Sequence, residues 1–367
     1  MSAPWGPCRT RRSREGATRG RSTTDGALME LGLLSLGDLL PDPATGISRT
    51  EAERHRSLVE QGVLAEQLGF HSVHLGEHHG SGYQLSAPAV VLAAIGERTS
   101  RLTLSTGVSL AANLDPFRMA EDYATVDVLS AGRAEIVVGR GSFFARIFEI
   151  FGQDPADSRA LFDEHVRLLL RLLTEERVDH AGPLRPVYGE TSRPRPLTPI
   201  TVWVGGGSSH SSIDLAAALG CPLMLPSVFA PPETFVAAVA RYREQWQRAG
   251  HASAPRVGAC CHCHVARDSQ TAHRQFKPAY SSYWNWVQDL VVAYTPQAQR
   301  MPFDYDAMVA GPAVVGSPAQ VVDRIGHFRE LLGLERMLFK FDLGGMPDAT
   351  LYPTLELFGH EVMSALA

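Results

Sequence analysis

The sequence has 367 residues, a formal net charge of −5, 44% hydrophobic residues and 20% charged residues. It holds no apolar run near the ~20 residues that cross a bilayer, which argues against a membrane protein. The number of cysteines is odd, five in all, and three of them crowd at Cys260, Cys261 and Cys263, which argues against a disulfide framework. We therefore expect a globular, cytoplasmic enzyme with either one α/β barrel or two smaller domains.

Residues 1–28 differ in composition from the rest. They hold six arginines and two acidic residues, which gives this segment a net charge of +4. Since the whole chain has a net charge of −5, the remainder has a net charge of −9. No apolar stretch follows Arg11 and Arg12, so the segment is not a secretory or twin-arginine signal. We expect a disordered extension or a misassigned start with Met29 as the true first residue. A basic nucleic-acid arm is less favoured, because Trp5 is its one aromatic residue and the body is acidic.

From Met29 onward the apolar patterns predict strands that alternate with helices. Strands are expected at 30–36, 72–75, 102–110, 134–138, 200–204, 222–225, 256–265 and 337–343. Helices are expected at 50–68, 87–98, 116–129, 156–174, 211–219, 232–248 and 319–332. Eight parallel-type strands predict a (β/α)8 barrel, and a doubly wound sheet is disfavoured because no dinucleotide fingerprint follows the first strand. Functional side chains should then lie in the loops after the strands.

Two histidines follow the second predicted strand. Glu77, His78 and His79 come directly after Val73 and Leu75, so at least one imidazole should point into the mouth of the barrel. Such a histidine can exchange protons near neutral pH. No metal site is expected here, because the histidines are adjacent and the sequence contains no His-Glu-x-x-His helix.

A second Cys/His cluster runs from Cys260 to His264 on the seventh predicted strand. Alternation on a strand places Cys260, His262 and His264 on one face and Cys261 and Cys263 on the other. No other cluster could complete a tetrahedral site, so we predict a plain strand without metal.

Glycines follow the third, fourth and fifth predicted strands. Gly107 and Val108 lie near the end of the third, and Gly139-Arg140-Gly141 follows the fourth, ahead of Phe143 and Phe144. Glycines let backbone approach a planar ring, and a guanidinium can balance negative charge or bind phosphate.

The fifth predicted strand leads into Gly205-Gly206-Gly207-Ser208-Ser209-His210-Ser211-Ser212, which opens a helix and can hold a phosphate. This run matches neither GxGxxG nor a P-loop, so an ordinary glycine turn with a serine cap remains the alternative.

Residues 266–318 are too long for a simple connection and contain six aromatic residues between Tyr280 and Phe303. Long segments of this kind are often lids over an active site. Aromatic residues that pack an extra helix against the barrel explain the composition equally well.

The order and spacing of these pieces resemble the bacterial luciferase-like flavin monooxygenases. The resemblance rests on three spaced pieces, which are Gly69–His79 with its Glu77-His78-His79, then Asp115-Pro116 with Ala120-Glu121-Asp122, and then Ser130-Ala131-Gly132-Arg133 running into Gly139-Arg140-Gly141. It extends from Met29 through the Val315–Val322 segment to the C-terminus. The most similar group consists of FMN-type oxidoreductases whose substrates are not generally known. The resemblance implies one barrel domain over 29–367, with the insertion at about 266–318 over the active-site mouth.

The resemblance also implies roles for particular residues. His78 would act in proton transfer beside flavin and substrate, with Glu77 orienting a neighbour, and Arg140 would stabilise flavin charge. A non-proline cis peptide at Gly107-Val108 would support the flavin ring. The FMN phosphate would be held by the start of the helix after the fifth strand, at Gly206, Gly207, Ser208 and Ser211.

The implied activity is oxidation of a small organic substrate with reduced FMN and O2, the FMN being reduced by a separate flavin reductase. A homodimer is the expected assembly, with no nucleic-acid or membrane partner. Three alternatives remain open. They are a deazaflavin-dependent hydride-transfer enzyme on the same barrel, a flavin-binding protein without catalysis, and a Schiff-base enzyme that uses Lys340 on the eighth strand.

Overall fold

The computed structural model describes residues 28–141, 143–207, 209–295 and 298–367. Its main sheet follows the order β3, β2, β1, β12, β10, β9, β8, β5 and β4, and neighbouring strands that pair within it are parallel. These strands are β1 Glu30–Ser35, β2 Ser72–Leu75, β3 Thr103–Thr106, β4 Ser109–Leu110, β5 Glu135–Gly139, β8 Thr201–Gly205, β9 Leu223–Leu225, β10 Val257–Val265 and β12 Arg336–Lys340.

The sheet curves round until β3 meets β5. Leu104 bridges Ala134 in the parallel sense, and the Leu104 amide donates to the Arg133 carbonyl at 2.9 Å. The Thr106 hydroxyl then donates to the Val137 carbonyl at 2.7 Å and accepts from the Val137 amide at 2.9 Å. Where β3 meets β5, the Thr106 side chain thus makes the two hydrogen bonds that the backbone would make in a regular strand pair. The predicted (β/α)8 barrel is thus confirmed, with β3 and β4 as two halves of its third strand.

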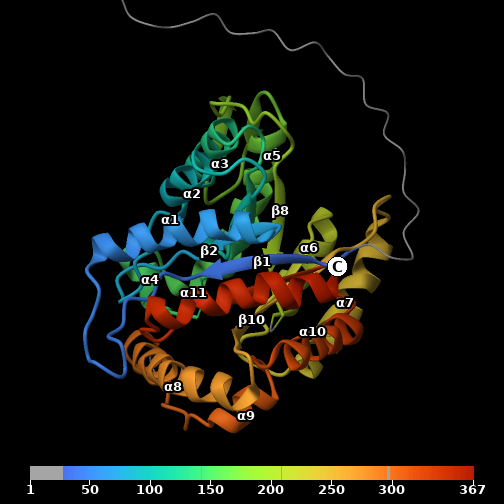
Figure 1. Cartoon of the computed structure of the whole chain (residues 1–367). Coiled ribbons are helices and arrows are strands. Elements are labelled where there is room, and N and C mark those ends of the chain that lie inside the picture. Colours follow the sequence, from blue (N-terminus) through green and yellow to red (C-terminus); the bar gives the residue numbers. More distant parts are fainter. Residues whose placement is uncertain (1–27, 142, 208, 296–297) are drawn as a thin grey trace, which may run out of the picture.

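Seven helices fill the connections that the sequence predicts, and Figure 1 shows them around the strands. Side-chain caps fix the starts of some of these helices, as at Thr50, whose hydroxyl accepts from the Glu53 amide while the Glu53 carboxylate accepts from the Thr50 amide. The helices are α1 Glu51–Leu68, α2 Pro88–Gly96, α3 Pro116–Leu129, α5 Ser158–Thr174, α6 His210–Leu219, α7 Val236–Ala249 and α10 Pro318–Leu332.

Several elements were not predicted. The segment after β5 contains the short helix α4 Arg146–Ile150, and the proline-rich connection contains a hairpin of β6 Val178–His180 and β7 Val187–Glu190. After β12 the chain forms α11 Asp348–Leu357, a π-helical turn and the short α12 Ser364–Leu366. Turns of 3-10 helix precede α5 and α7, at Pro155–Asp157 and Pro232–Phe235.

The floor of the barrel is closed by an ion-pair cluster. Arg336 pairs with Glu135 and with Glu30, and its guanidinium lies 4.5 Å from the centre of the buried Trp203 ring. Although burial opposes charge, the two carboxylates raise the pKa of Arg336, so the cluster stays ionised. Chemistry is therefore confined to the opposite end, where the strands terminate.

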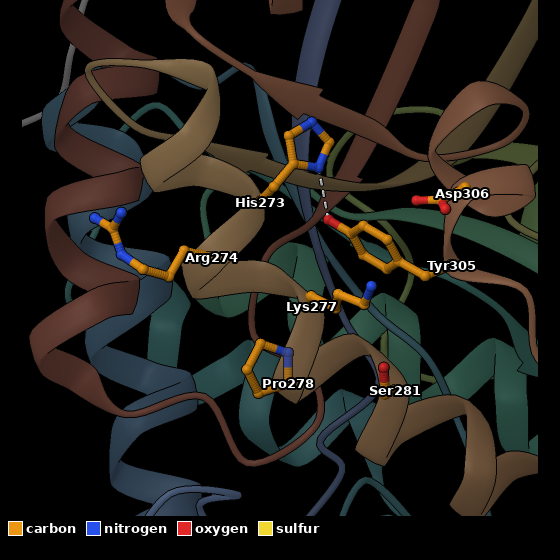
Figure 2. Close-up of a pocket in the computed structure, with 7 residues that line it drawn as sticks. All are labelled: His273, Arg274, Lys277, Pro278, Ser281, Tyr305 and Asp306. Atoms are coloured by element: carbon orange, nitrogen blue, oxygen red, sulfur yellow. Dashed lines mark hydrogen bonds between the residues drawn. The ribbon is translucent and has the colours of Figure 1, made fainter.

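The segment 266–318 is mostly helical. It contains α8 Ser269–Tyr294, α9 Tyr305–Ala310 and β11 Val314–Gly316, which pairs in parallel with the end of β10. In Figure 1, α8 and α9 lie together at the bottom of the view, away from α2, α3 and α5. The outer face of α8 is joined to α9 by a 2.7 Å hydrogen bond between the His273 ring and the Tyr305 hydroxyl, drawn in Figure 2.

In the described part of the chain, no helix is both long and apolar enough to cross a membrane.

Candidate active site

A cavity of about 530 Å³ lies at the carboxyl ends of the barrel strands. It has two sides, which we define by the sheet order. The catalytic arc, on β1, β2, β12 and β10, supplies Glu77, His78, Tyr83, His262 and Lys340. The cofactor arc, on β4, β5, β8 and β9, supplies Val108, Gly139, Arg140, Gly205, Gly206, Gly207, Ser209 and Ser212. Gly107 lies where the two arcs meet.

Glu77 orients His79. Its buried carboxylate accepts from His79 Nε2 at 2.6 Å through one oxygen and from the Leu110 amide at 3.1 Å through the other. The His79 ring packs edge-on against Phe151, with ring centres 4.8 Å apart. Both carboxylate oxygens of Glu77 are thus used in holding the loop after β2 to β4.

His78 faces the cavity. Its ring lies 3.9 Å from that of Tyr83 and 6.2 Å from that of Phe144, and its Nδ1 lies 3.5 Å from the Gly76 carbonyl. Since a carbonyl can only accept, this contact places the proton on Nδ1 and leaves Nε2 as an acceptor. Burial lowers the pKa of His78 to about 4, so the imidazole is neutral at pH 7.

The peptide bond between Gly107 and Val108 is cis, as the resemblance implied. It separates β3 from β4, and backbone hydrogen bonds hold it on both sides, from the Gly107 amide to the Leu75 carbonyl at 2.9 Å and from the Glu77 amide to the Val108 carbonyl at 2.8 Å. A Cβ at position 107 would lie 2.7 Å from Leu34, so the site requires glycine.

Arg140 follows β5 and lines the cofactor arc. Burial lowers its pKa, and the nearby charge of Arg159 lowers it further. Among the described residues it forms no ion pair, so its guanidinium is available to an anionic group. Gly139 beside it has no room for a side chain, because a Cβ would lie 2.5 Å from Val108 Cγ2.

The glycine turn after β8 leads into α6, whose first turn lacks a side-chain cap among the described residues. The Ser209 hydroxyl lies 2.8 Å from the Ser211 hydroxyl and makes no hydrogen bond to an α6 amide. Gly206, Gly207, Ser209 and Ser212 line the cavity, and Ser211 does not. Ser208, also expected at this position, lies outside the described residues.

The comparison with known proteins settles the family. A model of the luciferase-like monooxygenase family matches residues 29–335. The chain belongs to the luciferase-like monooxygenases. The resemblance inferred from the motifs is confirmed.

Three luciferase-like relatives are informative. The oxygenase component of the flavin-dependent trigonelline monooxygenase of Acinetobacter baylyi is 22% identical over 334 residues, 87% of this chain and 92% of the relative. The F420-dependent glucose-6-phosphate dehydrogenase of Intrasporangium calvum is 35% identical over 164 residues, 41% of this chain and 48% of the relative. The crystal structure of monooxygenase RslO1 from Streptomyces bottropensis superposes with a TM-score of 0.82 at 26% identity, covering 92% of this chain and 100% of that one.

In this luciferase-like monooxygenase, Lys340 is locked in a buried ion-pair network. Its Nζ donates to Asp38 Oδ1 at 2.5 Å, to Asp342 Oδ1 at 2.9 Å and to the Asp342 carbonyl at 3.0 Å. Asp342 also pairs with Arg54 at 2.6 Å. Burial acts to raise the pKa of Asp342, but the charges of Lys340 and Arg54 prevail and lower it to about 2. These bonds give Lys340 a structural role and disfavour a Schiff base.

Two residue pairs on the catalytic arc were missed by the sequence reasoning. The Tyr83 and Tyr283 hydroxyls lie 3.0 Å apart, and His262 Nδ1 lies 3.2 Å from the Tyr280 hydroxyl. Burial, together with the charge of Lys340, lowers the pKa of His262 to about 3. The tyrosines of α8 are aromatic residues of the predicted insertion, but only the fold shows which of them reach the cavity.

Metal ligation finds no support in the described residues of this luciferase-like chain, where no three His, Cys, Asp or Glu side chains converge on a common point. Cys260 and His262, which the strand alternation predicted on one face with His264, line the cavity, whereas His264 does not. Burial raises the pKa of Cys260 to about 11, so this thiol stays protonated.

Proposed function

We propose that this chain is the oxygenase component of a two-component flavin monooxygenase. It uses reduced FMN, delivered by a separate flavin reductase, and O2 to oxidise a small organic substrate. The observation that carries the proposal is the asymmetry of one cavity. Its cofactor arc offers a guanidinium and an uncapped helix start, whereas its catalytic arc offers neutral imidazoles and hydroxyls.

The phosphate end of FMN fits the start of α6. The N-terminus of a helix has free amides and a partial positive charge, which favour a phosphate. Here the Ser209 and Ser211 hydroxyls bond to each other, and Ser209 does not cap the helix. The first backbone N–H groups of α6 can therefore donate to a phosphate. Gly206 and Gly207 bring the chain to the cavity without a side chain in the way. We propose that Gly206, Gly207, Ser208 and Ser211 belong to this phosphate site, with Ser209 and Ser212 on its cavity side.

The ring end of FMN fits the wall formed by Gly107, Val108 and Gly139. Reduced flavin supplies the electrons that activate O2 when it is bound. Arg140 would offset the negative charge of that reduced ring, since its guanidinium lines the same arc and has no carboxylate partner among the described residues. Val108 would meet the ring with an apolar side chain.

His78 would manage protons from the catalytic arc. Its Nε2 accepts hydrogen bonds and takes up a proton only transiently, because the pKa of about 4 keeps the resting ring neutral. We propose that α8 excludes water above this ring. Tyr283 and Val287 of α8 line the cavity, and Tyr294 of α8 donates to the Gly80 carbonyl in the loop after β2.

Flavin titration tests the cofactor site. FMN should bind more tightly than riboflavin, which lacks the phosphate, and more tightly than FAD. Ser212→Asp places a carboxylate in the first turn of α6, where it is compatible with the helix but repels phosphate. It should weaken FMN by at least tenfold and leave riboflavin unchanged. Equal effects on both ligands would refute the phosphate site.

Deazaflavin-dependent hydride transfer is the second candidate. The 35% identity over 164 residues to an F420-dependent dehydrogenase favours it. Anaerobic incubation with F420 and a panel of alcohols should leave the F420 absorbance unchanged if the chain is a monooxygenase. Substrate-dependent reduction of F420, together with binding tighter than FMN, would establish this candidate instead.

A homodimer is also part of the proposal. Three large apolar side chains lie exposed on α2 and α3, with Val90 69% exposed, Val128 39% and Leu129 48%. These two helices pack on each other, and we propose that their exposed apolar side chains contact a second copy. Light scattering should give twice the mass of one chain. Leu129→Glu should reduce the measured mass to that of a single chain.

A further inference from the structure

The charged side chains of the catalytic arc are already satisfied. An ammonium group has three N–H donors, and all three of Lys340 are used by Asp38 and Asp342. Both oxygens of Glu77 are used by His79 and the Leu110 amide. A charged substrate bound against this arc would therefore lose its hydration without gaining a partner, which is costly in a buried site.

One neutral donor remains on the catalytic arc. The Tyr83 and Tyr283 hydroxyls share a single hydrogen bond at 3.0 Å, so one of their two protons is left over among the described contacts. Both side chains are buried and line the cavity. A second oxygen, supplied by a ligand, would accept this proton. The unprotonated nitrogen of His78 offers the complementary acceptor.

The walls and mouth of the cavity are aromatic. Tyr83, Tyr283 and Phe144 line it as buried rings, and the exposed Phe143 and Phe229 line it where the cavity reaches the surface. The rings of Phe143 and Phe229 stack 5.1 Å apart at 26°, although the two residues remain 47% and 49% exposed. Exposed, stacked phenylalanines at a cavity mouth favour contact with another flat apolar ring.

We infer that the substrate is an uncharged, largely aromatic compound with a carbonyl oxygen that the Tyr83 and Tyr283 hydroxyl pair binds. The inference rests on the proposed function, since FMN must occupy the cofactor arc for the substrate to be confined to the catalytic arc. Arg140, the cavity cation without a carboxylate partner, lies on the cofactor arc and is assigned to the flavin. The alternative is a substrate that the cavity binds through a charged group.

A matched pair of naphthalene compounds, with trigonelline as a second charged compound, tests this inference. The full-length protein, saturated with oxidised FMN, is titrated with 2-acetylnaphthalene, with 2-naphthoate and with trigonelline, a small zwitterion, and binding is followed by calorimetry. The neutral ketone should bind at least tenfold more tightly than either charged compound. The double variant Tyr83→Phe/Tyr283→Phe removes both hydroxyls, either of which can be the donor, and should weaken the ketone by about threefold to tenfold, the usual effect of one neutral hydrogen bond. Tyr188→Phe is the control, because Tyr188 is 75% exposed on β7.

The outcomes separate the inference from the proposed function. Charged compounds that bind as tightly as the ketone, a ketone that does not bind, or a Tyr83→Phe/Tyr283→Phe variant without effect would each overturn the inference while FMN binding stands. If FMN itself fails to bind, the titrations are repeated without it. Selective ketone binding that depends on the two tyrosine hydroxyls would then support the inferred substrate and refute the cofactor.

Discussion

Four histidines with lowered pKa values predict an early acid transition. His74, His78 and His264 have their pKa lowered to about 4, and His262 to about 3, with burial as the largest cause in each. His74 also has both ring nitrogens fixed, since Nδ1 donates to the Thr106 carbonyl and Nε2 accepts from the Ser72 hydroxyl, each at 2.9 Å. Protonation of this ring would break an existing hydrogen bond.

The direction in which stability changes with pH depends on whether the folded or the unfolded chain binds more protons. Between pH 6.5 and about 4 the unfolded chain protonates these histidines and the folded chain does not, so stability falls as pH falls. Each histidine contributes about 1.4 kcal/mol per pH unit, and the four together about 5.6 kcal/mol per unit. A free energy of unfolding of about 5–15 kcal/mol would then be largely exhausted between about pH 5.5 and pH 4.

Urea unfolding at pH 7.5, 6.5, 6.0, 5.5 and 5.0 measures this slope. The window lies above the range where lowered carboxylates contribute, because groups such as Glu66 lose their stabilisation only below an unfolded pKa of 4.5. His264→Gln preserves a donor to Gln275, whose carbonyl oxygen lies 3.1 Å from His264 Nε2, and should reduce the slope by about 1.4 kcal/mol per pH unit. The exposed His360 provides the control variant, His360→Gln. A stability that stays flat between pH 6.5 and 5.0 would refute the reasoning.

Three further predictions concern the cavity. His78→Ala should slow substrate oxidation by roughly 10²–10⁴ and release hydrogen peroxide, with FMN binding within several-fold, and His79→Ala should have a smaller effect; normal turnover of the first variant would exclude proton transfer at this position. Lys340→Met leaves the buried Asp38 carboxylate without its cation and leaves Asp342 with Arg54 alone, and should destabilise the fold by about 3–5 kcal/mol in urea unfolding, whereas an unchanged midpoint would mean that the network is not stabilising. Gly139→Ala should push Val108 toward the flavin and weaken FMN, and the added change Val108→Ala should restore binding; a double variant no better than the single one would contradict this steric account.

The barrel strands were predictable because each is a short apolar run that ends in glycine or polar residues. Ser72–Leu75 and Pro116–Leu129 match the predicted bounds. The third strand was predicted as one continuous run, but the cis peptide at Gly107-Val108 divides it into two. The sequence placed this peptide by resemblance, and apolar periodicity alone does not reveal such a break.

The structure of the insertion at residues 266–318 was harder to predict from the sequence. Phe276, Tyr280, Tyr283, Trp284 and Val287 are all buried and recur at helical spacing in α8, so the periodic signal was present. Pro278 lies inside α8. Its presence argues against a helix at this position, because proline lacks the amide donor of a helical hydrogen bond. Packing of the aromatic face against the barrel overrides that local cost. Whether the segment also opens as a lid stays a prediction.

The strand ends located His78 and Arg140, but the partners that define their chemistry come from elsewhere in the chain. Tyr83 and Tyr283 are 200 positions apart and meet only because the chain returns over the mouth of the barrel. The low pKa of His78 likewise arises from enclosure that no local motif encodes. A histidine that is neutral at rest, beside hydroxyls that keep their protons, suits a substrate that must be held by its oxygen without being ionised. Under the proposed function, the catalytic arc would constrain the substrate and the cofactor arc would constrain the flavin.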